Sequence, residues 1–379
     1  MLYTIVSGIG LFFTLFWVSE IVYVFRGIKD TRTSRHACDC KEGITVIKPI
    51  KDGDFQLREN LESWLTQDYK GPLQYILSFQ DKNDGALDIA KQLKERFPQM
   101  DIEIIINPII PGLNGKSSNM KHGVERAKYP VLVFGDSDTR VLPDFLCKIA
   151  KALADDKVGV VSCAQMNRGG WDFWTRFFTF IQNNETVFHW SFLTKMGMRV
   201  GANGAALGIR KKVLDEIGGI ESFGSSLLED MLLGNLLVDK GYRVKVGPFI
   251  ECHVNAIDKF KVLNYIQRSS IGFRTLIKKN VPVFIIMLSW YWIVFAMALC
   301  KLDYSLLQLY LLFLGIRTGT GLIQRWIIEK RILPVDFILP AFFDVFCTTY
   351  LFFSFKNSHV EWRGIRYKIH KNGNIEIVG

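Results

Sequence analysis

The sequence predicts an α/β protein: a cytosolic, Rossmann-like domain with a mainly parallel sheet and helices on both faces, joined to transmembrane helices. Two observations support this fold class. Between residues 44 and 164, short runs rich in Val, Ile and Leu alternate with amphipathic stretches, as in parallel sheets whose strands are connected by helices. Long apolar runs flank this region, and residues 281–300 contain no charged residue. About 20 such residues suffice to span a bilayer.

The first apolar run, residues 3–25, contains a single charged residue, Glu20, and is followed by Arg26, Lys29 and Arg32. No basic residue precedes the run and no small-residue cleavage site follows it. We therefore expect an uncleaved anchor over residues 1–26 rather than a signal peptide. The basic residues after the anchor indicate that the chain continues on the cytoplasmic side.

After a polar linker (27–43), the alternating pattern predicts one domain over residues 44–259. Residues 55–67 carry apolar side chains at helical spacing, and the β-branched runs read as buried strands. The predicted strands are 44–50, 73–81, 101–107, 130–138 and 158–164. The predicted helices are 55–67, 85–97, 118–128 and 143–153.

Residues 260–280 combine a hydrophobic side with basic residues, which indicates an interfacial amphipathic helix or, alternatively, the last helix of the domain. Membrane segments are expected over 281–355. Within them, 281–300 and 304–324 read as spans, whereas 332–355 contains Asp336 and Asp344 as well as two prolines. We expect this last run to be re-entrant or interfacial, so that the basic tail (356–379) returns to the cytoplasm.

The chain carries a formal net charge of +10. Next to membrane spans, attraction to anionic lipid headgroups explains this charge better than nucleic acid, so no nucleic-acid partner is expected. The seven cysteines show neither a CxxC pair nor even spacing, which predicts reduced thiols in a protein facing the cytosol.

The stretch "PVLVFGDSD" (130–138) runs from a buried-looking strand into Asp136 and Asp138. Two carboxylates this close repel each other unless a cation lies between them. Hard oxygen ligands suit Mg²⁺ or Mn²⁺, which bind proteins through one or two carboxylates plus substrate phosphates. Asp81 also ends a predicted strand, and strands of a parallel sheet present their carboxyl ends at one ligand-binding edge. The sequence therefore predicts a metal–phosphate site at this edge.

Three further features each allow two interpretations. Lys116 lies in the Gly/Asn-rich loop 111–120, which either binds a phosphate or is a plain surface loop. Glu229 and Asp230 begin a Leu-rich helix, where the helix dipole alone would favour them. His189 lies in the aromatic block 171–190 and is interpreted as a structural hydrogen-bonding residue rather than a catalytic one.

The blocks "VIKPIKDGD", "FQDKNDGA", "GLNGKSSNM", "GDSDTRV", "NGAALGIRKKVLDEIGG", "LLEDMLLGNLLVDKGYRV" and "WRGIRY" occur in this order. Together they resemble the ceramide glucosyltransferase family of inverting enzymes with a GT-A fold. The resemblance implies a UDP-sugar donor, by default UDP-glucose, and a lipid acceptor in the bilayer, by default ceramide. The alternatives are a hopanoid or another lipid with UDP-N-acetylglucosamine or another UDP-sugar, and, more remotely, an inactive membrane scaffold.

The resemblance also implies roles for individual residues. Asp230 would be the general base. Asp136 and Asp138 would hold Mn²⁺ or Mg²⁺ and the donor diphosphate, with Asp138 as the direct metal ligand, and Asp81 would hold the uracil. The remaining donor-binding positions are Lys48, Pro49, Lys116, Asn203, Gly204 and Glu229.

One block departs from the family. Its (Gln/Arg)-x-x-Arg-Trp motif corresponds here to a stretch in which Gly272 replaces the arginine and Phe273 the tryptophan. Gln267 and Arg268, or alternatively Arg274, are expected to substitute from neighbouring turns. This change affects the region where the resemblance places the acceptor.

Overall fold

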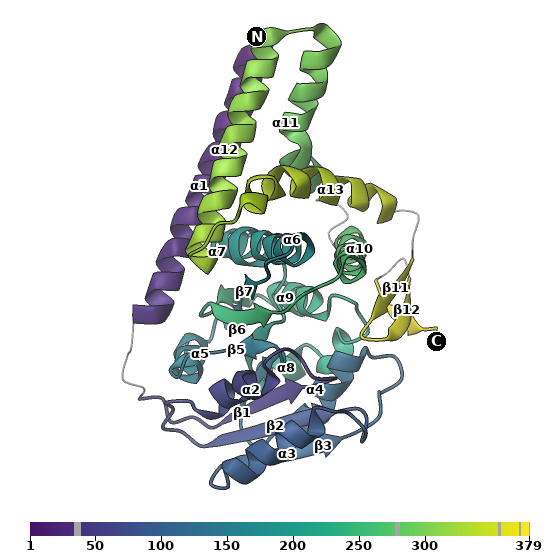
Figure 1. The fold of residues 1–379 in the computed structure, drawn as a ribbon. Coiled ribbons are helices and arrows are strands. Elements are labelled where there is room, and N and C mark those ends of the chain that lie inside the picture. Colours follow the sequence, from purple (N-terminus) through teal and green to yellow (C-terminus); the bar gives the residue numbers. More distant parts are fainter. Residues whose placement is uncertain (34–38, 277–280, 355–357, 371–372, 379) are drawn as a thin grey trace.

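The computed structural model describes residues 1–33, 39–276, 281–354, 358–370 and 373–378 (Figure 1). It confirms the predicted α/β class with a mainly parallel central sheet. Within the described residues, this sheet has the strand order β3-β2-β1-β4-β8-β6-β9. Its strands are β1 (Ile44–Pro49), β2 (Leu73–Phe79), β3 (Asp101–Ile106), β4 (Val131–Gly135), β6 (Val158–Cys163), β8 (Ala206–Arg210) and β9 (Arg243–Val246).

The five predicted strands are all present, and β1 pairs in parallel with both β2 and β4. Strand β8 is antiparallel to β4 and β6, and no strand was predicted at its position. The helix predicted at 118–128 begins earlier, at Gly115, because the side chain of Asn114 accepts a hydrogen bond from the Ser117 backbone N–H at 2.7 Å. This cap satisfies one of the free donors at the helix start.

Helices cover both faces of the sheet with separate apolar cores. One face packs against α2 (Leu57–Leu65), α3 (Leu87–Arg96) and α5 (Phe145–Leu153). The other face packs against α4 (Gly115–Arg126), α8 (Lys211–Glu216), the 3₁₀ helix η2 (Ile220–Ser222) and α9 (Glu229–Asp239). The sheet is therefore buried on both sides, and the rim at the strand ends is left for a ligand.

Two small sheets and a helical layer complete the domain. The first sheet has the order β5-β10-β7 and the second β11-β12-β13. Their strands are β5 (Thr139–Arg140), β7 (Gln165–Gly169), β10 (Ile250–Val254), β11 (His359–Trp362), β12 (Ile365–Ile369) and β13 (Ile375–Ile377). The helical layer contains α6 (Phe173–Gln182), the π-helix η1 (Asn183–Trp190), α7 (Ser191–Lys195) and α10 (Lys259–Leu276).

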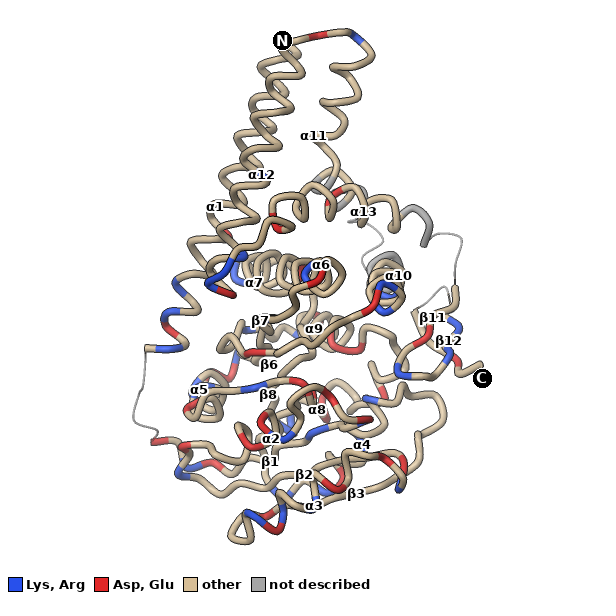
Figure 2. Tube along the Cα trace, in the orientation of Figure 1, with Lys and Arg blue, Asp and Glu red and all other residues tan. Residues whose placement is uncertain are grey.

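Three helices project from the domain as a bundle: α1 (Leu2–Thr33), α11 (Val281–Lys301) and α12 (Tyr304–Glu329) (Figure 1). Among the described residues, α1 and α12 are long and apolar enough to cross a membrane. Figure 2 shows few charged residues in the distal part of the bundle, apart from the turn that joins α11 to α12. This distribution supports membrane association.

The last apolar run does not join the bundle. It forms the 3₁₀ helix η3 (Pro334–Phe337) and α13 (Leu339–Ser354), and α13 lies across the base of the bundle (Figure 1). At about 1.5 Å per residue, its 16 residues are too short to cross a hydrocarbon core about 30 Å thick. The chain then returns to the domain, where the Ile375 N–H donates to the Ser225 carbonyl at 2.9 Å. The described part of the tail therefore packs against the domain, while its cytoplasmic location stays a prediction.

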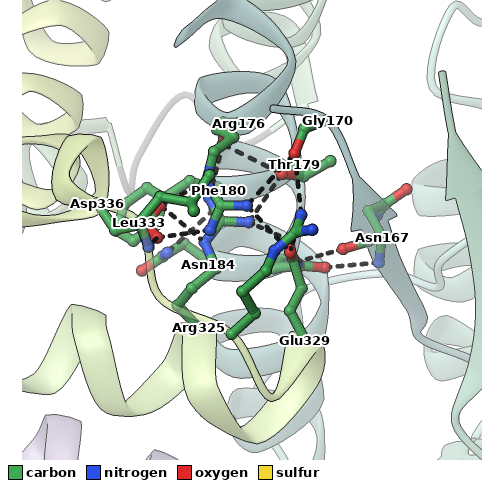
Figure 3. Close-up of polar contacts among 12 residues, drawn as sticks. Asn167, Gly170, Arg176, Thr179, Phe180, Asn184, Arg325, Glu329, Leu333 and Asp336 are labelled. Atoms are coloured by element: carbon green, nitrogen blue, oxygen red, sulfur yellow. Dashed lines mark hydrogen bonds and ion pairs between the residues drawn. The ribbon is translucent and has the colours of Figure 1, made fainter. Parts of the chain in front are cut away.

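A buried ion cluster fixes the turn between α12 and α13. The Arg176 cluster consists of Arg176, Arg325, Glu329 and Asp336 (Figure 3). Arg176 from α6 contacts both acids: its Nε donates to Asp336 Oδ1 at 2.8 Å and its Nη1 to Glu329 Oε2 at 3.1 Å. Asp336, one of the two acids that made residues 332–355 a poor span, is thus paired with a cation from the domain.

The cysteine prediction needs one correction. Cys40, Cys163, Cys252, Cys300 and Cys347 are free thiols, as expected. Cys147, however, is disulfide-bonded, so the expectation that the cysteines are reduced is wrong at this position.

Candidate active site

A cavity of about 390 Å³ opens where β1, β2 and β4 end. Because these strands are parallel neighbours, their carboxyl ends lie along one rim. The cavity runs from this rim, past the start of α9, to η1 and α13. The predicted site residues that line it are Pro49, Lys116, Asp136, Asp138, Asn203, Gly204, Glu229, Asp230 and Arg268.

Lys116 forms an ion pair with Asp136. Its Nζ lies 2.8 Å from Asp136 Oδ1 and 3.4 Å from Glu229 Oε1, and it donates to the Gly204 carbonyl at 3.0 Å. Burial lowers the pKa of Lys116, but the surrounding carboxylates outweigh this effect and the net pKa is raised. Lys116 therefore stays charged at the centre of the cavity, so it is not a plain surface-loop residue.

Asp138 has a buried oxygen, Oδ1, without a hydrogen-bond partner among the described residues. Burial, with repulsion from Asp136 and Asp54, raises its pKa to about 6, although Arg363 and Lys48 oppose this. A buried carboxylate oxygen that lacks a donor suits a cation. Within the described part of the chain, no group of three or more His, Cys, Asp or Glu side chains could hold a metal by itself. Asp138 thus fits a divalent ion that takes its other ligands from phosphate and water.

Lys48 lies behind the cavity wall rather than in it. Its side chain is 1% exposed, its Nζ donates to the Asp136 carbonyl, and the Trp64 ring lies 4.0 Å away. Burial lowers its pKa to about 7, even though Asp136 opposes the shift. Lys48 therefore positions the loop that carries Asp136 instead of lining the cavity.

Both oxygens of Asp230 accept backbone hydrogen bonds. Gly204 N–H donates to Oδ2 at 2.6 Å and Met231 N–H to Oδ1 at 2.8 Å. Burial raises the pKa of Asp230, and the nearby Lys116 opposes the shift. A side chain at position 204 would meet Asp230 Oδ2 at 2.8 Å, so the contact requires glycine there. This is a fixed carboxylate with enhanced basicity, as a general base requires.

Glu229 and Asn203 support this arrangement. Glu229 is 6% exposed, pairs with Lys116, and has a pKa that burial raises to about 7. The backbone of Asn203 exchanges hydrogen bonds with the Ser162 hydroxyl at 2.8 and 2.9 Å, which fixes the turn leading to Gly204. Glu229 thus acts on the site through its ion pair with Lys116, and Asn203 acts through its backbone, which positions Gly204.

Two predicted positions, Asp81 and Gln267, lie outside the cavity lining, whereas the neighbouring Arg268 belongs to it. Asp81 is exposed and accepts from the Asn83 N–H at 2.9 Å, and the neighbouring Gln80 lines the cavity instead. Gln267 donates to the His359 carbonyl at 3.0 Å and so contacts the tail. Arg268 lines the cavity and stacks on the Trp362 ring, 5.0 Å from its centre.

The altered motif itself is only partly visible. Gly272, Phe273 and Arg274 lie within α10, but the side chains of Phe273 and Arg274 lie outside the described residues. Of the three positions expected to substitute for the missing arginine, only Arg268 is seen to line the cavity.

The tail contributes a cation that the sequence prediction missed. Arg363 and Gly364 form the two-residue turn between β11 and β12, both with positive φ (51° and 73°). Arg363 Nη1 donates to the Lys51 carbonyl at 2.8 Å and to Asp54 Oδ1 at 3.2 Å. Burial lowers its pKa, but Asp54 and Asp138 outweigh this and raise it. The block "WRGIRY" was noted in the sequence, but its proximity to Asp138 depends on the long return of the chain.

The other end of the cavity is apolar. Phe343, Cys347 and Leu351 of α13 line it, and their spacing of four places them on one face of that helix. His189 also lines this part, and its Nδ1 lies 2.6 Å from Glu20 Oε1 on α1. This pairing confirms the interpretation of His189 as a structural hydrogen-bonding residue.

Comparison with known families agrees with this geometry. Residues 11–375 match the family described as glycosyl transferase family 21. The chain belongs to glycosyl transferase family 21. This family 21 chain is 28% identical over 209 residues to ceramide glucosyltransferase 3 of Caenorhabditis elegans and 26% identical over 206 residues to ceramide glucosyltransferase 1 of that organism. Each match covers 54% of the chain and 44% of the relative, so the matched part spans less than half of these relatives.

A solved structure has a similar fold. It is a mannosyltransferase of Pyrobaculum calidifontis in complex with GDP-mannose and Mn²⁺. The TM-score is 0.52 at 18% identity, and the match covers 93% of this family 21 chain and 98% of the mannosyltransferase. The likeness extends over nearly the whole chain and supports the GT-A type of fold.

Proposed function

We propose that this protein is a membrane-bound inverting glycosyltransferase. It moves a sugar from a UDP-sugar, by default UDP-glucose, to a lipid hydroxyl, by default that of ceramide. The observation that carries this proposal is the cavity itself. At one end it holds a buried carboxylate, Asp230, beside Lys116 and the 136–138 loop, and at the other end it is lined by the apolar face of α13. The names of the family relatives support the same chemistry.

The residues divide the reaction between them. Asp230 accepts the proton of the acceptor hydroxyl as that oxygen attacks the anomeric carbon. Lys116 and Arg363 provide positive charge for the departing diphosphate. Asp136 and Asp138 would hold the divalent ion, which would supply further positive charge for the same leaving group. Because one base supports a direct displacement, an α-linked donor gives a β-linked product.

The fold supports a lipid acceptor at the bilayer surface. Phe343, Cys347 and Leu351 of α13 line the apolar end of the cavity. Helix α13 lies across the base of the helical bundle (Figure 1). A lipid can therefore place its head near Asp230 while its chains remain near the membrane. The basic residues Arg26, Lys29 and Arg32 at the domain end of α1 support a cytoplasmic location for the domain.

The test of this proposal is donor turnover by the detergent-purified protein with Mn²⁺ or Mg²⁺. UDP release is followed from UDP-glucose, UDP-galactose and UDP-N-acetylglucosamine, each with and without ceramide or a total lipid extract. We expect release from UDP-glucose that ceramide stimulates. Release with another donor or lipid would keep the mechanism and change the substrate. If the protein neither bound a donor nor released UDP, an enzymatic function would be refuted.

Asp138→Asn should weaken metal-dependent donor binding. The amide removes the charge that a divalent ion needs, so we expect the affinity for UDP-glucose in Mn²⁺ to fall at least about tenfold. Isothermal titration with and without a chelator measures this effect. Asp88 is an exposed carboxylate on α3, so Asp88→Asn is the matched control and should leave binding unchanged. Equal chelator sensitivity in Asp138→Asn and the unmodified protein would contradict the assignment.

Arg363→Gln should weaken donor binding through lost charge at the diphosphate. A charge-assisted hydrogen bond contributes enough that the KM for the UDP-sugar should rise about tenfold. Arg366→Gln removes the same charge from an exposed position on the adjoining strand and should have little effect. Steady-state kinetics of both variants measure the difference, and equal KM values would remove Arg363 from the donor site.

A further inference from the structure

Glu185 lines the same cavity as Asp230 and the apolar residues of α13. It belongs to the π-helix η1 and lines the cavity together with Gln182 and Tyr265. π-helical turns are rare and are frequently found at functional sites. Among the residues of the proposed mechanism, none occupies this segment, so Glu185 has no assigned role.

The position of Glu185 is fixed by its surroundings. The Tyr265 hydroxyl donates to Glu185 Oε2 at 2.9 Å, and the Tyr265 ring packs edge-on against Phe178 with 5.2 Å between ring centres. At the start of η1, the Asn183 side chain accepts from the Asn167 N–H at 2.8 Å and donates to the Asn167 carbonyl at 2.9 Å. The carboxylate is thus held in place before any ligand binds.

Glu185 is half-buried in the cavity wall and has few partners. Among the described residues, Tyr265 supplies the one hydrogen bond that the structure gives it. The other groups that face it are His189, which is paired with Glu20, Arg268 from α10, and Cys347 from α13. Burial raises the pKa of Glu185 to about 7, although Tyr265, His189 and Arg268 oppose the shift. A ligand with a suitable hydrogen-bond donor would therefore be bound strongly here.

We propose that Glu185 binds an N–H or O–H group on the head of the lipid acceptor, next to the hydroxyl that receives the sugar. This inference rests on the proposed function and specifies its acceptor class. An ionised carboxylate only accepts hydrogen bonds, so it selects a head group with a second donor. A lipid that has the reacting hydroxyl alone leaves Glu185 with only its hydrogen bond from Tyr265, and sites built to bind a second donor reject such analogues.

The experiment compares ceramide with 1,2-diacylglycerol of matched chain length in the same detergent micelles. Both lipids present a primary hydroxyl, but only ceramide has an amide N–H and a second hydroxyl. For the unmodified protein, we expect kcat/KM to be at least about tenfold higher with ceramide. Glu185→Gln should reduce this preference mainly by raising the KM for ceramide.

Glu216→Gln is the matched control. Glu216 accepts a hydrogen bond from the Tyr242 hydroxyl at 2.6 Å on the exposed surface. The substitution therefore changes the same kind of Tyr–Glu pair, but away from the cavity. The Glu216→Gln variant should prefer ceramide over diacylglycerol as strongly as the unmodified protein does. A second measurement is the pH dependence: the KM for ceramide should fall as the pH rises through about 7 in the unmodified protein, but not in Glu185→Gln.

The outcomes separate this inference from the function on which it rests. Four results would overturn the role of Glu185. The unmodified protein could use both lipids equally, prefer diacylglycerol, or use neither lipid although it hydrolyses the donor. Alternatively, Glu185→Gln could keep the full preference for ceramide. Donor binding and hydrolysis would still support the proposed transferase. Absence of donor binding in the unmodified protein would refute the proposed function itself.

Discussion

Asp230→Asn is expected to lose sugar transfer by about 10²–10⁴-fold while it still binds the UDP-sugar. The amide has the size of the carboxylate but cannot accept the proton of the attacking hydroxyl. Lys116 and the 136–138 loop, which bind the donor diphosphate in this proposal, remain in place. Single-turnover transfer to ceramide measures the loss, and isothermal titration with UDP-glucose measures the retained donor affinity.

A matched change on the same helix separates this effect from general damage to α9. Asp239 is exposed and paired with Arg199 at 2.7 Å, so Asp239→Asn should transfer sugar at the unmodified rate. If Asp230→Asn kept transfer within about tenfold of the unmodified protein, Asp230 would not be the general base. The proton would then have to go to another group in the cavity.

Arg176→Met is expected to destabilise the protein by about 3–5 kcal/mol. Arg176 is fully buried, and its removal leaves Glu329 and Asp336 without their main shared cation (Figure 3). Breaking one partner of a buried ion network costs far more than breaking an exposed pair, because the remaining charges stay out of water. The melting temperature of the purified protein should fall clearly.

The control is Arg199→Met, which removes an ion pair with both side chains 53% exposed. Exposed pairs contribute about 0–1 kcal/mol, so this variant should melt close to the unmodified protein. Similar melting temperatures for the two variants would show that the Arg176 cluster does not hold the turn between α12 and α13. Asp336→Asn tests the same cluster from the other side and should also lower the melting temperature.

The alternation of apolar and amphipathic runs was sufficient to predict the parallel part of the sheet. Each predicted strand is a short β-branched run whose burial requires helices on both faces, and that requirement is local to the sequence. Strand β8 was missed because "AALGIR" follows Gly204 and contains Gly208, and it becomes a strand only by pairing antiparallel with β4 and β6. Such pairing depends on neighbours that lie far away in the chain.

The aspartates of the site could be found because they end a strand. Asp136 and Asp138 follow β4 directly, so the sequence places them at the rim of the sheet. Their cations could not be predicted with the same certainty. Lys116 had two interpretations until its Nζ was seen 2.8 Å from Asp136, and Lys48 turned out to support the loop from behind.

The sequence by itself therefore determined the fold class, the apolar helices and the acidic residues at the strand ends, because each follows from a local pattern of polarity. Only the tertiary structure brought Arg363 to the acidic rim, Arg176 to Asp336, and Glu185 to the wall of the cavity. These contacts join segments that are up to about 300 residues apart. Their physical reason is the need of buried charges for partners, which the folded chain meets with whichever opposite charge its topology brings near.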